Sequence, residues 1–304
     1  MRTVKAFSPC HITGFFQIVD GSSNPLYIGS RGGGVCLKRG VLTVVRVEKA
    51  SSLALQVSIN GVPSNSAEVS RYLLNMFTSS FKDLGSFKIL VEHYVDAPIG
   101  AGFGTSGAAA LSLALALNEA FNLGMSNTEA AQYAHVAEVE CKTGLGTVAA
   151  EAFGGVEVRV RAGAPGIGEI IPITVARDIF VVCLTFGALP TRDLLSNYEV
   201  RKRVNVFGGE LVDKIVKAPT VSNLMKFSRY FADHVGLVSS RVRKIFEAGD
   251  KAGIVVSMPM FGEGAFTICD RDSLEDVLAL FRKFKSQGRI IISEVDFEGA
   301  RVME

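Results

Sequence analysis

The chain has 304 residues and a formal net charge of +2, with 48% hydrophobic and 20% charged residues. These values are typical of a compact globular protein with one large domain or two of ordinary size. The balanced charge excludes an electrostatic nucleic-acid surface. No apolar stretch reaches the ~20 residues of a membrane span, so we expect neither nucleic acid nor membrane as a partner.

The cysteines point to a reducing compartment. They are five in number, and no two form a Cys-x-x-Cys pair. The opening Met1-Arg-Thr-Val-Lys5 has no signal-peptide pattern, so we expect reduced thiols and a cytoplasmic protein. The four histidines lack the spacing of zinc ligands.

Periodicity in the first half of the chain predicts strands and then helices. In some segments apolar and polar residues alternate, as in strands, and in others apolar residues recur every three or four positions, as in helices. Strands are expected at 41–49, 53–60, 87–95 and 156–161, and helices at 68–82, 108–121 and 127–140. The last of these helices begins with a capping box formed by Ser126 and Glu129.

A cluster of glycines and a proline at 162–168 predicts a domain boundary, which divides the chain into 1–165 and 166–304. The second part predicts a β-α-β-β-α-β order, which is the ferredoxin-like unit. Its strands are expected at 179–185, 254–258, 265–269 and 289–295, with helices within 192–249 and at 273–285.

The segment Pro98-Ile-Gly-Ala-Gly-Phe-Gly-Thr-Ser-Gly107, here called the glycine loop, enters the apolar helix at 108–121. Glycines let the backbone approach a ligand closely, and a helix N-terminus offers unpaired N–H groups with partial positive charge. This combination predicts an anion site, and phosphate is the usual occupant.

The glycine loop has three other possible interpretations. A Walker A loop requires a lysine, but none lies between Lys88 and Lys142, which excludes it. A dinucleotide fold requires a second strand that ends in an acidic residue, whereas a second helix follows here. A buried turn whose small residues only allow tight packing remains open.

The glycine loop resembles the phosphate loop of the galactokinase–homoserine kinase–mevalonate kinase–phosphomevalonate kinase (GHMP) superfamily. Segments 6–16, 144–155 and 258–266 are similar to the other GHMP motifs, in the same order. His11-Ile-Thr-Gly-Phe-Phe16, Gly29-Ser-Arg-Gly-Gly-Gly-Val-Cys-Leu37 and Lys142-Thr-Gly-Leu-Gly146 resemble segments of archaeal pantoate kinases. Gly14-Phe15-Phe16 replaces the Gly-Glu-His usual in galactokinases and mevalonate kinases.

The resemblance implies an α+β fold with an N-terminal ribosomal-protein-S5-like, ATP-binding domain and a C-terminal ferredoxin-like domain. The active site would lie in the cleft between them. The implied activity is transfer of the γ-phosphate of ATP to the C4 hydroxyl of (R)-pantoate, giving 4-phosphopantoate for coenzyme A synthesis. A homoserine kinase-like activity and a non-catalytic nucleotide or metabolite sensor are the alternatives. Relatives are often dimers, so the resemblance allows a homodimer.

The resemblance also assigns the nucleotide and metal site. The nucleotide-binding residues would be Pro98, Gly100, Ala101, Gly102, Gly104, Thr105 and Ser106. Ser106 and Glu138 would bind Mg²⁺, although Ser106 is also a candidate helix N-cap. Thr147 stands where many relatives carry a catalytic aspartate, and threonine is no base at neutral pH. We expect proximity and magnesium to carry the reaction, or Glu151 to substitute.

The substrate site is assigned to residues that could recognise a carboxylate and hydroxyl groups. These are His11, Thr13, Ser30, Arg31, His135, Arg159 and Thr191. Arg31 and Arg159 are the candidates for a forked carboxylate clamp. A helix-surface histidine and a solvated strand face are the alternatives for His135 and Arg159.

Overall fold

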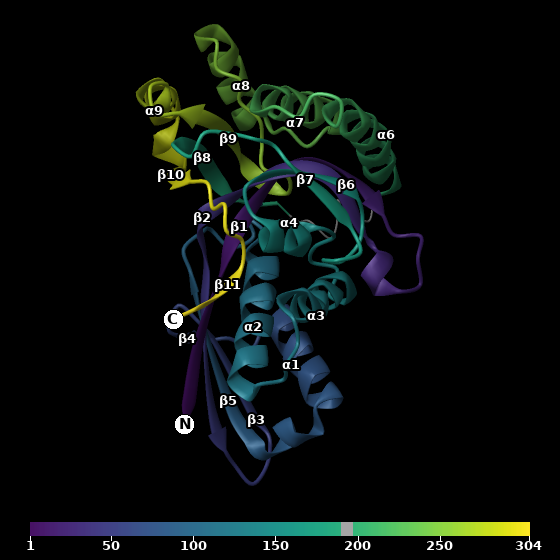
Figure 1. Cartoon of the computed structure of the whole chain (residues 1–304). Coiled ribbons are helices and arrows are strands. Elements are labelled where there is room, and N and C mark those ends of the chain that lie inside the picture. The colour runs from purple at the N-terminus through teal and green to yellow at the C-terminus, as the bar shows by residue number, and fades with distance from the viewer. Residues whose placement is uncertain (190–196) are drawn as a thin grey trace.

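The structure, a computed structural model, describes residues 1–189 and 197–304. In these residues the chain forms an eight-stranded sheet, a three-stranded sheet and the helices that pack against them (Figure 1). The α+β prediction is confirmed. Thr191 lies outside the described residues.

Two long strands, β1 (Arg2–Val19) and β2 (Gly29–Lys49), form an antiparallel ribbon that runs through both halves of the molecule (Figure 1). The register of β1 shifts between Thr13 and Phe15. Such a bulge bends a strand and redirects its side chains. The alternation pattern missed β1 and the first half of β2, because bulges and consecutive glycines interrupt the period of two.

The ribbon is the centre of the larger sheet, whose order is β11-β1-β2-β5-β3-β4 with β6 and β7 branching from β2. The outer strands are β3 (Ala54–Ile59), β4 (Val62–Pro63), β5 (Phe87–Val95), β6 (Val156–Arg161), β7 (Glu169–Pro172) and β11 (Arg301–Met303). Helices α1 (Glu68–Ser80), α2 (Thr105–Phe121) and α3 (Asn127–Glu140) cover one face of this sheet (Figure 1).

Helix α2 is buried on nearly all sides, and α3 begins with the predicted capping box, in which Ser126 and Glu129 bond reciprocally. The short helix α4 (Thr147–Phe153) packs between α2 and the ribbon. Within the described residues, no helix has the length and apolar character to cross a membrane.

The predicted boundary at residue 165 falls inside a hairpin. Strands β6 and β7 pair across the turn at 162–168 and belong to the same sheet. The chain passes to the second sheet between Pro172 and Ile179. The glycines and proline of this segment therefore make a tight turn within the first sheet, and the division into two domains stays a prediction.

The second sheet has the order β10-β8-β9, from β8 (Ile179–Ala188), β9 (Gly262–Asp270) and β10 (Arg289–Glu294). Its helices are α6 (Tyr198–Ile215), α7 (Val221–Val235), α8 (Ser240–Ala252) and α9 (Leu274–Arg282). The strand predicted at 254–258 is reduced to one bridge between Ser257 and Phe266. Pro259 follows two residues later and has no N–H to extend the ladder. The element order is otherwise that of the ferredoxin-like unit.

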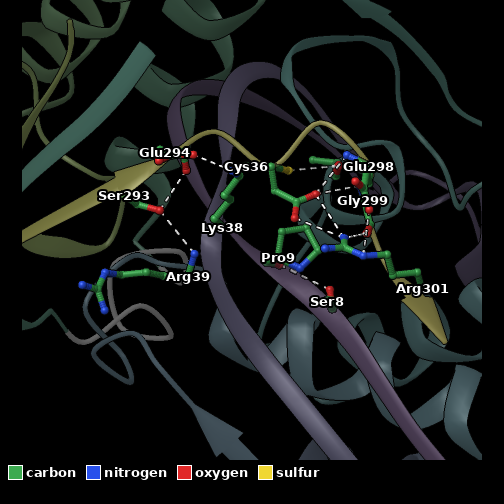
Figure 2. A network of polar contacts seen from close by, with 12 residues as sticks. Ser8, Pro9, Cys36, Lys38, Arg39, Ser293, Glu294, Glu298, Gly299 and Arg301 are labelled. Atoms are coloured by element: carbon green, nitrogen blue, oxygen red, sulfur yellow. Dashed lines mark hydrogen bonds and ion pairs between the residues drawn. The ribbon is translucent and has the colours of Figure 1, made fainter. Parts of the chain in front are cut away.

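The C-terminal segment returns from β10 along the ribbon and ties the two sheets together (Figure 2). Lys38 of β2 forms an ion pair with Glu294, and the Arg39 N–H donates to Ser293 Oγ at 3.2 Å. Strand β11 then pairs with β1, with Arg301 opposite Phe7. These contacts hold the two sheets in one arrangement around the ribbon.

Candidate active site

A cavity of about 480 Å³ opens where the glycine loop, β1 and the turn before β9 meet. Of the predicted site residues, its lining includes His11, Thr13, Ser30, Gly100, Gly102, Gly104, Thr105, Ser106 and Thr147. Met260 and Phe261 close it from the part of the chain that carries the second sheet. The volume falls within the range of small-ligand sites.

The glycine loop requires its glycines for both backbone conformation and space. Gly102 and Gly104 have φ values of +82° and +65°, a region that favours glycine. A Cβ on Gly102 would lie 2.8 Å from the Met260 carbonyl oxygen, and one on Gly104 would lie 2.6 Å from Glu151 Oε1. The glycine loop ends where α2 begins, so the N–H groups of the first turn face the cavity side of the helix.

Ser106 and Glu138 come together beside the cavity, from the first turn of α2 and from α3. Burial raises the pKa of the Glu138 carboxyl, and hydrogen bonds from Thr143 and Ser106 oppose that rise. The Thr143 hydroxyl donates to Glu138 Oε1 at 2.7 Å, whereas Oε2 is buried without a hydrogen-bond partner among the described residues. The N-cap of α2 is Gly104, so Ser106 is not the cap.

The Ser106 and Glu138 oxygens fit a magnesium ion, which prefers hard oxygen ligands and keeps several of its waters. The Oε2 of Glu138 is buried without a partner among the described residues, and a divalent cation there would compensate the charge of the ionised carboxylate. No group of three histidine, cysteine or carboxylate side chains in the described ranges could enclose a metal. The Ser106 and Glu138 oxygens therefore suit a cation whose other ligands come from a bound phosphate and water.

Thr147 lines the cavity as the first residue of α4, and Glu151 follows one turn later. Burial raises the pKa of the Glu151 carboxyl well above its usual range, and the charge of Glu138 adds to the rise. A Cβ on Gly104 would lie 2.6 Å from both Glu151 Oε1 and Thr147 Cγ2. Glu151 does not line the cavity, and its carboxylate lies against the backbone of the glycine loop at Gly104 instead.

Three buried side chains meet where β1, β2 and β6 run together. His11 Nε2 lies 2.9 Å from Glu157 Oε1, and Arg159 Nη1 also bonds this oxygen. Arg159 is only 2% exposed, so the interpretation of a solvated strand face is wrong. Its Nε is buried without a hydrogen-bond partner among the described residues.

Arg159 Nε and Ser30 Oγ border the same small space beside Gly146. A Cβ on Gly146 would lie 2.2 Å from Ser30 Oγ and 3.2 Å from Arg159 Nε. Ser30 and Gly146 line the cavity. Arg159 itself does not line the cavity, and its guanidinium lies directly behind Ser30 and Gly146.

Two predicted substrate residues lie elsewhere. Arg31 donates to Asp213, Gln17 and the Val160 carbonyl, and it does not line the cavity. His135 is buried, with Nε2 2.9 Å from the Ile28 carbonyl oxygen, so it holds a loop against α3 rather than contacting the cavity. The structure does not bring either side chain to the site, and the helix-surface interpretation of His135 is also wrong.

Pro98 and Ala101 complete the predicted nucleotide set, and neither lines the cavity. Ala101 is buried, and a Cβ on Gly262 would lie 2.0 Å from its carbonyl oxygen. The Ala101 backbone therefore packs against Gly262 rather than facing the cavity.

Sequence reasoning missed Glu157, Lys142 and Phe261. Lys142 and Phe261 line the cavity with φ values of +55° and +64°, which are strained for residues other than glycine. No periodicity signals such a conformation. Glu157 had a signal, since it is a charged residue between two valines, Val156 and Val158, that are buried in the core.

The family model "GHMP kinases N terminal domain" matches residues 69–155. The chain is 33% identical to the pantoate kinase of Methanocaldococcus jannaschii, over 91% of this chain and 96% of that protein. It is 36% identical to the pantoate kinase of Thermococcus kodakarensis, over 90% and 89%. A solved structure described as "Phosphotransferase related to CoA biosynthesis pathway" has a TM-score of 0.89 and 32% identity, with 99% of each chain covered.

Proposed function

The chain belongs to the GHMP kinases, in the pantoate kinase family, and on that premise we propose that it phosphorylates (R)-pantoate. It transfers the γ-phosphate of ATP to the C4 hydroxyl and gives 4-phosphopantoate for coenzyme A synthesis. The observation that carries the proposal is the meeting of Ser106 and Glu138 directly after the glycine loop. We place the reaction in the cytoplasm, since none of the five cysteines forms a disulfide.

The glycine loop holds the triphosphate. Backbone N–H groups of Gly102, Gly104 and the first turn of α2 supply dipoles to the phosphate oxygens, and they need no reorganisation during the reaction. Magnesium held by Ser106 and Glu138 would neutralise charge on the β- and γ-phosphates when bound. The Glu138 carboxylate stays oriented because Thr143 fixes its other oxygen.

The pantoate carboxylate binds beside Gly146, where it meets Arg159 and Ser30. The free Nε of Arg159 and the Ser30 hydroxyl are both donors that a carboxylate can satisfy. Glu157 engages the guanidinium through Nη1 and leaves Nε for the substrate. This arrangement favours a small hydroxy acid over a neutral sugar.

Thr147 contributes a cavity wall and a hydroxyl group rather than a base. A threonine hydroxyl does not ionise near pH 7, so it cannot remove the proton of the acceptor. Phosphoryl transfer depends chiefly on positioning and on charge stabilisation, which the residues above provide.

The test is an incubation of the purified protein with ATP, magnesium and pantoate, followed by mass detection of 4-phosphopantoate and measurement of ADP release. Homoserine and mevalonate serve as competing acceptors. ADP release with homoserine alone would indicate a homoserine kinase-like enzyme. ATP binding without ADP release for any acceptor would indicate a sensor. Either result would overturn the proposal.

A further inference from the structure

A chain of hydrogen bonds runs from the cavity into the ribbon through Thr13, His11 and Glu157. Thr13 Oγ1 lies 3.2 Å from His11 Nδ1, and His11 Nε2 lies 2.9 Å from Glu157 Oε1. Thr13 and His11 line the cavity, whereas Glu157 is fully buried. A hydroxyl, an imidazole and a carboxylate stand in this order in sites where the imidazole acts as a base and the carboxylate orients it.

Gly34 makes this chain possible. It pairs with Thr13 on one side and with Glu157 on the other, so it separates β1 from β6. A Cβ at Gly34 would lie 2.4 Å from His11 Nε2. The His11 imidazole therefore lies over Gly34 of β2, and the missing side chain at this position allows the ring to reach Glu157 on β6.

The contacts of Glu157 determine the His11 tautomer. Glu157 Oε1 accepts a hydrogen bond from the Arg159 guanidinium and lies 2.9 Å from His11 Nε2, so it is the acceptor toward both side chains. His11 Nε2 must then carry the proton, which leaves Nδ1 as a bare acceptor. Thr13 donates its hydroxyl proton to Nδ1, and the lone pairs of Oγ1 remain for a ligand in the cavity.

Strand β1, which carries His11 and Thr13, contacts the glycine loop on one side of the cavity and Met260 on the other. The His11 N–H donates to the Phe103 carbonyl at 3.0 Å, and a Cβ on Gly104 would lie 3.3 Å from the His11 carbonyl oxygen. The Met260 N–H donates to the Thr13 carbonyl at 3.1 Å. Backbone contacts therefore hold the Thr13 hydroxyl beside the loop that would carry the phosphates.

Glu157 and Arg159 of β6 are the charged groups that act on His11. Gly34 of β2 and the Phe103–Gly104 backbone present no charge. Burial lowers the pKa of His11, Glu157 opposes this, and Arg159 adds to it. The imidazole is therefore neutral near pH 7. A substrate carboxylate beside Arg159 would offset the positive charge of the guanidinium, and this would make His11 a better proton acceptor.

We propose that Thr13 and His11 form a proton relay that takes the place of the aspartate absent at Thr147. The inference rests on the proposed function. As the acceptor oxygen bonds to the γ-phosphorus and the bond to ADP breaks, the acceptor proton passes to Thr13 Oγ1. The Thr13 proton passes to His11 Nδ1, and Glu157 stabilises the imidazolium. The proton leaves by the reverse path after product release.

Matched Thr13 variants test the relay. Thr13→Val removes the hydroxyl at nearly constant volume, and Thr13→Ser keeps it. In single-turnover reactions with saturating ATP and pantoate, we expect Thr13→Val to be slower by about 100-fold or more and Thr13→Ser to stay near wild type. The affinity for ATP should not change in either variant, and thermal unfolding checks that both are folded.

Two further measurements separate proton transfer from substrate binding. The wild-type rate should fall at acidic pH as His11 is protonated, and this limb should be absent in His11→Gln. Added imidazole should restore part of the rate of His11→Gly. A Thr13→Val enzyme with the wild-type rate, or a folded His11→Gly enzyme without rescue, would overturn the relay alone. A wild-type protein that forms no 4-phosphopantoate would overturn the proposed function and the relay together.

Discussion

The Glu151 carboxylate lies against Gly104 of the glycine loop, where an added Cβ would stand 2.6 Å from Oε1. Glu151 is fully buried, and neither of its oxygens has a hydrogen-bond partner among the described residues. Burial raises the pKa of the Glu151 carboxyl, which lies directly against the backbone that would hold the phosphates.

Gly104→Ala should weaken ATP binding by about tenfold or more, because the methyl group forces the loop away from Glu151. Isothermal titration with ATP and magnesium measures the effect. Gly124→Ala is the matched control, since Gly124 also has a positive φ of +73° but has open space around it. It should lose stability through backbone strain and bind ATP normally. Equal loss of affinity in both variants would contradict the steric argument.

Glu138→Gln should lower turnover by about 100-fold or more, because the amide keeps the shape but loses the charge that would attract the cation. The magnesium concentration for half-maximal rate should rise in the same variant. Glu140→Gln, on the exposed side of the same helix, is the control and should behave like wild type. An unchanged magnesium dependence in Glu138→Gln would remove this residue from the cation site.

Glu151→Gln should stabilise the free protein, increasingly so at higher pH. The folded pKa of Glu151 lies above the ordinary value of 4.5, so the folded state binds more protons than the unfolded state as the pH rises through that interval. Stability is therefore lost with rising pH, by up to ~1.4 kcal/mol per unit for this group. Urea unfolding of both proteins between pH 5 and 9 should show a widening difference. A constant difference would mean that Glu151 does not titrate in this way.

His93 should make the protein sensitive to acid. Its ring is buried between Thr43 Oγ1 at 2.8 Å and Ser70 Oγ at 3.0 Å, and burial lowers its pKa to about 4. The unfolded chain takes up this proton near pH 6.5, so stability falls as the pH drops from there to about 4, by roughly 3 kcal/mol.

The His93→Gln variant isolates the contribution of His93 to the pH dependence of the unfolding free energy. It should be less stable than wild type at pH 7, because the hydrogen bonds to Thr43 and Ser70 are disturbed. Its unfolding free energy should depend less on pH between 6.5 and 4. Parallel pH profiles of the two proteins would assign the acid sensitivity to other groups.

Thr147→Ala should keep turnover within about tenfold of wild type, because the threonine hydroxyl is not the proton acceptor. Steady-state assays with pantoate measure kcat and KM separately. Thr147→Val, which keeps the branched shape, controls for packing against Gly104. A fall to the rate without enzyme would show that the hydroxyl itself is required.

Helices and strands with regularly spaced apolar residues could be predicted, because an element that buries one face needs apolar side chains at a fixed period. The helix at 127–140 with its Ser126 capping box and the strand at 87–95 agree with the observed bounds of α3 and β5. The glycine loop was also predictable, because positive φ and close approach require glycine at particular positions. The early strand β1 was not, because its bulges and polar residues serve the cavity and interrupt the period.

The amino-acid sequence alone indicated the glycine loop, because close approach and positive φ require glycine at particular positions. The resemblance of its motifs to those of the GHMP kinases implied the family and the pairing of Ser106 with Glu138. Only the tertiary structure decided which charged side chains lie next to the residues that line the cavity. Arg31 and Arg159 look alike as strand arginines, but one is held by Asp213 and the other is buried beside Glu157. Partners from distant strands make that choice, and the position of Gly34 between His11 and Glu157 is visible only when β1, β2 and β6 lie side by side.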